Sequence, residues 1–252
     1  MPNLPRPVPD YQRIAERCVV LASLARVAHA EEVRTPRIIV NVLASALLLV
    51  GVAGCVPVEP GSLGPSGTPR STTGAPTATE STRLLDQLAV ARAASMSGYT
   101  RDRFPHWRSA GKNCDVRDTV LQRDGTGVEV SGCNVVGGRW VSVYDNRTFT
   151  DPSDVDIDHM VPLANAWRSG ADDWDDTRRG DFANDLTRPQ LLAVSASSNR
   201  AKGDQDPSTW KPSNRDFWCE YAQDWIAVKH FWKLTVTTAE KAALTDMLET
   251  CP

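Results

Sequence analysis

Apolar positions divide the chain into three stretches. Residues 38–50 form a mainly apolar run, residues 56–82 contain almost no bulky apolar side chain, and apolar positions return in periodic patterns from residue 83 onwards. A segment as polar as 56–82 cannot bury enough surface to offset the entropy of ordering it, so we expect a flexible linker there. The folded part is therefore predicted to be one domain at residues 83–252.

Periodicity within residues 83–252 predicts helices together with strands. Helices with an apolar face are predicted at residues 84–94, 217–232 and 238–250. Strands punctuated by glycine are predicted at residues 128–130, 135–136 and 139–144. Residues 117–121 fit either a short helix or a strand. The predicted fold class is α+β.

The apolar run at residues 38–50 has the features of an export signal. Two arginines precede it, and Val52-Ala-Gly-Cys55 closes it. The run is short for a membrane span and is flanked as a signal peptide is. Small residues before a Cys are typical of a bacterial lipobox. Residues 34–55 are therefore predicted to be a lipoprotein signal peptide, with Cys55 lipidated and the protein exported to the outer face of the cell membrane or released.

Residues 1–33 lie upstream of the place where an export signal normally begins. Our interpretation is that translation starts at Val33, read from a GTG codon as Met. The alternative is a genuine N-terminal extension with a helix around residues 11–30. A peptide from residues 1–32 in the unprocessed precursor would exclude the start at Val33.

Four cysteines lie outside the leader, and an even number in an exported chain indicates disulfides. Three pairings of the four are possible, and pairing between sequence neighbours favours Cys114–Cys133 and Cys219–Cys251. The first would close the hairpin region and the second would join the two C-terminal helices. A zinc site is the alternative, but the Cys-x-x-Cys spacing that it needs does not occur.

Residues capable of catalysis occur in two segments about forty residues apart. The first, residues 156–163, reads Asp-Ile-Asp-His-Met-Val-Pro-Leu, and its Asp-His pair ends a short alternating run. Neighbouring residues of a strand point to opposite faces. Asp158 and His159 can therefore serve one site only where the strand ends or bends.

The second segment, residues 190–203, reads Gln-Leu-Leu-Ala-Val-Ser-Ala-Ser-Ser-Asn-Arg-Ala-Lys-Gly. Its apolar run predicts a strand, Ser195 suits the N-cap of a short helix, and Gly203 ends that helix. The helix carries Asn199. The order of strand, connection, strand and helix is that of a ββα-metal site.

These motifs resemble the HNH endonuclease superfamily. Asp-His-x-Val-Pro-Leu and Asn-Arg-x-Lys-Gly carry the resemblance, which covers about residues 84–251. The text around them is similar to a secreted actinobacterial branch that shares its domain with GmrSD-type restriction enzymes, with matching stretches at residues 164–171, 182–185 and 202–207. The resemblance implies a ββα-metal (HNH, or His-Me finger) core with flanking helices and a β-hairpin region.

The resemblance also implies roles. His159 would be the general base, and its reference pKa near 6.5 suits proton transfer from water at physiological pH. Asp158 and Asn199 would hold a divalent metal. Mg²⁺ is expected, because it accepts two protein oxygens and keeps several waters; Mn²⁺, Ca²⁺ and Zn²⁺ are alternatives.

Two residues compete for the position of the family's middle Asn, which orients the base. Gln190 lies nine residues before Asn199, at the spacing of that position, and Asn184 in Phe-Ala-Asn-Asp is the other candidate. The sequence leaves this choice open. The basic residues expected at the substrate phosphate are Arg117, Arg200 and Lys202, with a solvated lysine as the alternative for Lys202.

Composition and charge limit this picture only slightly. The 252 residues carry a net charge of −3, so any surface that binds nucleic acid must be a local basic patch. No groove-reading helix or zinc finger is apparent in the sequence, which favours low sequence specificity. His-Glu-x-x-His and Gly-x-Ser-x-Gly, two protease motifs, are absent from the sequence.

The sequence therefore predicts an exported, membrane-tethered, metal-dependent nuclease that acts as a monomer on DNA, with RNA as an alternative substrate. The rival class is a non-catalytic envelope lipoprotein that keeps the fold for binding. Asp158, His159 and Asn199 occur together, which favours catalysis.

Overall fold

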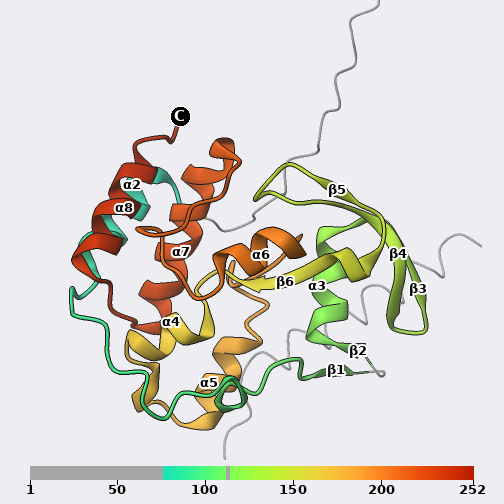
Figure 1. Cartoon of the computed structure of the whole chain (residues 1–252), viewed down its shortest axis with the longest axis horizontal. Coiled ribbons are helices and arrows are strands. Elements are labelled where there is room, and N and C mark those ends of the chain that lie inside the picture. The colour runs from blue at the N-terminus through green and yellow to red at the C-terminus, as the bar shows by residue number, and fades with distance from the viewer. Residues whose placement is uncertain (1–75, 112–113) are drawn as a thin grey trace, which may run out of the picture. The chain divides into compact units, whose positions relative to one another are not determined.

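The computed structural model describes residues 76–111 and 114–252 (Figure 1). The predicted signal peptide, its lipidated Cys55, the start at Val33 and residues 56–75 of the predicted linker lie outside the described residues. Within the described part, no helix is long and apolar enough to span a membrane.

The described chain contains both helices and short strands, as the α+β prediction requires. The helices are α2 (Ala78–Gln87), α3 (Val116–Asp124), α4 (Leu163–Arg168), α5 (Asp176–Ala183), α6 (Ala196–Lys202), α7 (Trp218–Trp232) and α8 (Thr238–Leu248). The strands are β1 (Ser109–Gly111), β2 (Cys114–Asp115), β3 (Thr126–Ser131), β4 (Asn134–Val141), β5 (Thr148–Phe149), β6 (Val155–His159) and β7 (Leu191–Ser195).

The strands form three small antiparallel sheets in the described part, β1–β2, β3–β4–β5 and β6–β7. The β6–β7 pair runs from Val155 opposite Ser195 to His159 opposite Leu191. Helix α6 follows β7 directly, so the order strand, strand, helix agrees with the prediction. Figure 1 shows β6 and α6 between the helices α2, α7 and α8 on one side and the β3–β4 hairpin on the other.

Local signals set the ends of α6. The Ser195 hydroxyl accepts a hydrogen bond from the Ser198 amide, which satisfies one of the free donors in the first turn. Gly203 ends the helix with a φ of 55°, a conformation that glycine adopts without steric cost. Both features agree with the sequence analysis.

Two hydrophobic clusters cover opposite faces of β6–β7. Ile157 and Ala193 pair across the strands and pack with Val120 of α3 in the smaller cluster. Leu192 and Val194, on the other face, belong to the larger cluster, which includes α7 and α8. Because strand residues alternate, Asp156 and Asp158 share the face of Leu192 and Val194, and His159 shares the face of Ile157.

The predicted helix at residues 84–94 was placed too late. Helix α2 starts at Ala78, inside the predicted linker, because the Thr77 side chain caps it by accepting from the Glu80 amide. It ends at Gln87, since the backbone beyond it pairs with another segment: Val236 N–H donates to Ala89 O, and Ala91 N–H donates to Val236 O. The predicted domain start at residue 83 is therefore moved to the beginning of α2.

Both predicted disulfides are confirmed. Cys114–Cys133 ties β2 to the turn of the β3–β4 hairpin, and Cys219–Cys251 joins α7 to the residues after α8. Residues 117–121, left between helix and strand by the sequence, lie in α3.

Candidate functional site

The Asp158 carboxylate lies on the α6 side of β6, and two buried donors hold it. The Tyr144 hydroxyl donates to Asp158 Oδ2 at 2.5 Å, and Lys202 Nζ lies 2.6 Å from the same oxygen. Within the described chain, no hydrogen bond is formed by Oδ1. Asp158 is 4% exposed, so the carboxylate is fixed in position by its partners rather than by water.

Lys202 is fully buried at the end of α6, and protein oxygens take all three of its ammonium protons. Besides Asp158 Oδ2, the acceptors are His159 O at 2.8 Å and Met160 O at 3.0 Å. The prediction that Lys202 contacts the substrate phosphate is therefore wrong, because no donor remains for a phosphate oxygen. The alternative of a solvated lysine is wrong as well. Lys202 instead fastens α6 to the end of β6.

Burial opposes both charges of this pair. It raises the pKa of the Asp158 carboxyl and lowers the pKa of the Lys202 ammonium, since each charge has lost its hydration. The contact between them acts in the other direction on both groups. A buried pair of this kind is favourable only while both members are present.

Asn199 lies one turn before Lys202 on α6, and its side chain faces Asp156 on the same side of the β6–β7 hairpin. Asn199 Nδ2 donates to Asp156 Oδ2 at 3.1 Å, which leaves the Asn199 carbonyl oxygen as an acceptor. Arg200 Nε lies 3.8 Å from Asp156 Oδ2, and its side chain is 74% exposed. Arg200 is therefore exposed beside Asp156, and its contact with a substrate stays a prediction.

The oxygens on this face suit a hard divalent cation. Asp156 and Asp158 are two residues apart on one strand face, and Asn199 and Lys202 meet them from one face of α6. Carboxylate and amide oxygens are the ligands that Mg²⁺ accepts, and hydrogen bonds to such carboxylates are usual around a metal. Residues 76–111 and 114–252 contain no group of three or more His, Cys, Asp or Glu placed to hold a metal. A cation here would be held by few protein ligands and by water.

His159 lies at the end of β6 on the opposite face. Its Nε2 is 2.9 Å from the Ala183 carbonyl oxygen, which can only accept, so Nε2 carries the proton and Nδ1 is left with a lone pair. The Trp107 ring packs near it, with centroids 5.9 Å apart. No hydrogen bond in the described chain joins the His159 ring to Asp156, Asp158 or Asn199. The site therefore has its carboxylates and its histidine on two faces of one strand end.

Burial keeps the His159 ring neutral. The loss of hydration lowers its pKa from 6.5 to about 3, and the positive charge of Arg101 acts in the same direction. The hydrogen bond to Ala183 O opposes this shift. A neutral imidazole with Nε2 protonated can accept a proton only at Nδ1.

Gln190 is a buried clamp on the turn that follows His159. Its Oε1 accepts from Val161 N at 3.1 Å and its Nε2 donates to Val161 O at 2.9 Å. Its backbone oxygen also accepts from Met160 N at 2.7 Å. Gln190 therefore fixes the backbone that follows the histidine, and its assignment to the middle position stays a prediction.

Asn184 holds a different segment. Its Oδ1 accepts from Arg108 N at 3.0 Å, and its Nδ2 donates to Pro105 O at 2.7 Å. It follows Ala183, whose carbonyl binds His159. Asn184 thus positions the loop that carries Trp107, and it acts on His159 less directly than Gln190 does.

Arg117 ties α3 to the beginning of β6. Its Nη2 donates to the carbonyl oxygens of Pro152 and Val155, at 3.0 Å each. Val155 starts the strand that His159 ends. A phosphate contact by Arg117 stays a prediction, and the observed contacts are structural.

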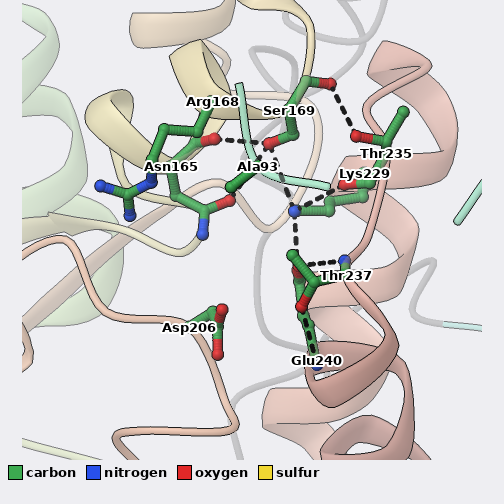
Figure 2. Close-up of a pocket in the computed structure, with 9 residues that line it drawn as sticks. All are labelled: Ala93, Asn165, Arg168, Ser169, Asp206, Lys229, Thr235, Thr237 and Glu240. Carbon is green, nitrogen blue, oxygen red and sulfur yellow. Dashed lines mark hydrogen bonds and ion pairs between the residues drawn. The ribbon is translucent and has the colours of Figure 1, made fainter. Parts of the chain in front are cut away.

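A small cavity of about 30 Å³ lies away from these residues, where α4, α7 and the start of α8 meet (Figure 2). Its volume suffices for water but for little else. The side chains around it are Ala93, Asn165, Arg168, Ser169, Asp206, Lys229, Thr235, Thr237 and Glu240. None of the predicted site residues lines it.

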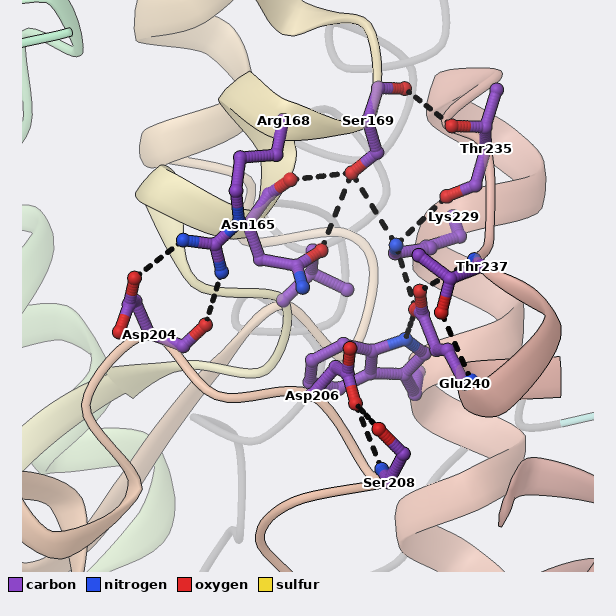
Figure 3. A network of polar contacts seen from close by, with 12 residues as sticks. Asn165, Arg168, Ser169, Asp204, Asp206, Ser208, Lys229, Thr235, Thr237 and Glu240 are labelled. Carbon is purple, nitrogen blue, oxygen red and sulfur yellow. Dashed lines mark hydrogen bonds and ion pairs between the residues drawn. The ribbon is translucent and has the colours of Figure 1, made fainter. Parts of the chain in front are cut away.

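A polar network surrounds this cavity (Figure 3). Lys229 Nζ lies 2.6 Å from Glu240 Oε1, which also accepts from Trp225 Nε1 at 2.7 Å. The Arg168 guanidinium donates to the carboxylate and to the backbone carbonyl oxygen of Asp204. Arg168 ends α4, which follows the first motif, and Asp204 follows α6. This contact therefore joins the two segments that carry the predicted site residues.

Two contacts of the site were missed by the sequence analysis. The sequence places Tyr144 in a predicted strand and predicts no role for Trp107. Their one sequence signal is an aromatic residue in a polar stretch. Neither the fourteen-residue separation of Tyr144 from Asp158 nor the longer one of Trp107 from His159 predicts a contact.

The chain is similar to a known domain family and to a fungal protein. Residues 123–247 match the family model of the C-terminal domain of GmrSD restriction endonucleases. A protein of the fungus Arthroderma benhamiae, described as an uncharacterized secreted protein, is 52% identical over 177 residues, which are 70% of this chain and 87% of that protein. No solved structure matches. Because this relative is fungal, it gives no support to an actinobacterial branch.

Proposed function

We propose that this chain, which belongs to the same family as the secreted Arthroderma benhamiae protein and matches the C-terminal domain of GmrSD restriction endonucleases, is a metal-dependent endonuclease of the HNH type. The family match indicates nuclease activity in general. The HNH chemistry, the metal and the DNA substrate are our proposal.

The observation that carries the proposal is the protonation pattern at the end of β6. His159 is neutral, its Nε2 proton is committed to Ala183 O, and only Nδ1 can accept a proton. One residue earlier, Asp158 is held by Tyr144 and Lys202 through a single oxygen. His159 Nδ1 on one face of the strand end and the free oxygen of Asp158 on the other are the two acceptors on which we base phosphodiester hydrolysis.

In the proposed mechanism, His159 Nδ1 takes a proton from the water that attacks the phosphorus. Asp158 and Asn199, with Asp156 beside them, would hold the divalent cation. Such a cation stabilises the charge that develops on the phosphate and on the leaving 3′ oxygen. Gln190 keeps the backbone after His159 in place, and Arg200 is the exposed cation available to the substrate.

The cellular setting is also proposed rather than shown. The name of the Arthroderma benhamiae protein describes it as secreted, and two disulfides in this chain suit an oxidising compartment. We propose an exported monomer tethered to the membrane through Cys55. The competing proposal is an envelope lipoprotein that uses the same fold for binding alone.

The test uses the oxidised chain with supercoiled plasmid DNA, with and without Mg²⁺. Cleavage that requires Mg²⁺ and falls about 10²–10⁴-fold in His159→Ala is expected, because that is the usual contribution of a general base. His230→Ala is the matched control and should leave the rate unchanged, since the His230 ring on α7 forms its hydrogen bond with Gln87 of α2 and contacts none of the predicted site residues in the described chain. Cleavage that survives His159→Ala would refute His159 as the base. Intact DNA and RNA with Mg²⁺, Mn²⁺, Ca²⁺ and Zn²⁺ would favour the binding lipoprotein.

A further inference from the structure

The segment from Tyr99 to Arg108 forms a wall beside the candidate base. The Trp107 ring lies 5.9 Å from the His159 ring, and the His106 ring lies 5.4 Å from that of Trp107. This segment comes from before α3 and is more than fifty residues from His159 in the sequence. Its position therefore depends on how it is fastened to the rest of the domain.

The wall is fastened on both sides of its two central rings. On one side, Phe104 is fully buried and packs edge-on against Trp167 and Phe182. On the other side, the Arg108 side chain binds Asp181 Oδ1 at 2.6 Å. A Cβ on Gly180 would lie 1.9 Å from Arg108 Nη2, so the glycine is what admits this guanidinium onto α5.

Asn184 bridges the ends of the same stretch by binding both Pro105 O and Arg108 N. The residues between these two points, His106 and Trp107, are therefore presented at a fixed place next to His159. A half-buried Trp107 with a φ of 58° shows that the surroundings, and not local preference, set the backbone here.

The charges on the wall are not equivalent. Arg108 is paired with Asp181, and Arg103 Nη2 lies 3.9 Å from Asp176. Arg101 is exposed and has no carboxylate partner in the described part of the chain. Its Nε faces His106 Nε2 at 3.4 Å, and neither of its Nη groups forms a hydrogen bond with a described residue.

His106 is oriented so that it can accept from Arg101. Its Nδ1 is 2.8 Å from Phe104 O, a carbonyl oxygen that can only accept, so Nδ1 carries a proton and Nε2 offers a lone pair. One edge of the Arg101 guanidinium is thereby held, and the other edge is left open. An open guanidinium edge matches two oxygens of a phosphate.

We propose that Arg101, held by His106 on this wall, binds a backbone phosphate of the nucleic acid next to the phosphodiester bond that water attacks with His159 as its base. This inference rests on the proposed function and adds to it a substrate contact. The contact would be independent of sequence, since a phosphate carries no base identity. It also supplies the local basic position that a chain of net charge −3 requires.

The test measures binding and does not require cleavage. Fluorescence anisotropy of a short labelled DNA duplex, in EDTA, gives Kd at several salt concentrations for wild type, Arg101→Gln and Arg83→Gln. Arg101→Gln should raise Kd about tenfold or more, the effect of losing a hydrogen bond to a charged group, and should reduce the salt dependence by about one counterion. Arg83→Gln should leave Kd unchanged, because Arg83 is exposed on α2 and that helix packs on α7 and α8.

A second variant tests the role of His106. His106→Phe keeps a ring beside Trp107 and removes the acceptor for Arg101, so its Kd should lie between those of wild type and Arg101→Gln. If Arg101→Gln binds as Arg83→Gln does, or if wild type does not bind the duplex at low salt, the inference is overturned. If the wild type cleaves plasmid and Arg101→Gln binds the duplex normally, the phosphate contact is refuted and the proposed nuclease activity is kept. If Arg101→Gln binds more weakly but the wild type does not cleave plasmid, the phosphate contact is kept and the proposed nuclease activity is refuted.

Discussion

Lys202 Nζ lies 2.6 Å from Asp158 Oδ2, and the two side chains are 0% and 5% exposed. The pair connects the end of α6 to the end of β6, which are the two elements that carry the predicted site. Its members depend on each other, because either charge alone would be buried without a partner. The pair therefore links stability to the geometry of the site.

Replacing Lys202 by Met should destabilise the domain by about 3–5 kcal/mol, the usual cost of leaving one buried charge unpaired. Adding Asp158→Asn to the same chain should recover part of this loss, since no charge is then buried. Urea denaturation measures both. Lys241→Met is the control, because Lys241 pairs with Asp86 at the surface and such pairs contribute up to about 1 kcal/mol. Equal losses for the two lysines would contradict this account.

Tyr144→Phe should impair metal binding at the site more than it destabilises the fold. It removes the hydroxyl that donates to Asp158 Oδ2, so we expect a loss of about 1.5–3 kcal/mol in stability and a 10–100-fold rise in the Mg²⁺ concentration needed for half-maximal cleavage. Tyr221→Phe is a matched control. Its hydroxyl is buried and has no hydrogen-bond partner in the described chain, so its removal should be neutral or stabilising. An unchanged Mg²⁺ dependence in Tyr144→Phe would count against Asp158 as a metal ligand.

The choice between Gln190 and Asn184 can be made by kinetics. Gln190→Leu removes both hydrogen bonds to Val161 and should lower kcat by about 10–100-fold with little change in KM, as expected for a group that supports the reacting residues. Asn184→Leu releases the wall that carries Trp107 and should act mainly on KM. Circular dichroism checks that both variants fold. The reverse split between kcat and KM would assign the middle position to Asn184.

Acid should destabilise the domain partly through His159. Its pKa is about 3 in the folded chain and 6.5 for the free side chain, because burial disfavours the charged ring. Between these pH values the unfolded chain binds a proton that the folded chain does not, so the stability is fully present above about pH 6.5 and falls as the pH decreases towards 3. At about 1.4 kcal/mol per pKa unit, the whole effect is on the order of 5 kcal/mol.

The measurement compares urea denaturation of wild type and His159→Leu at several pH values, in EDTA. Groups common to both chains cancel in the difference, so the wild type should lose more stability than the variant as the pH falls from 6.5. Parallel curves for the two chains would show that His159 does not titrate in this way.

The sequence alone determined the features that depend on neighbouring residues. An alternating run predicted β6, a continuous apolar run predicted β7, Ser195 and Gly203 predicted the ends of α6, and the cysteine spacing indicated both disulfides. The helix at residues 84–94 failed because its last residues were drawn into a pairing with Val236, which no local pattern encodes.

Only the tertiary structure decided which polar residues meet. Lys202 has the sequence context of a solvated lysine, and it is buried because α6 folds back over β6 and brings its ammonium to Asp158 and two carbonyl oxygens. Trp107 reaches His159 only because Asn184 and Arg108 fasten its loop to α5. The physical reason is that burial and hydrogen-bond partners depend on positions in space, while residue type and spacing report only on the chain within a few turns.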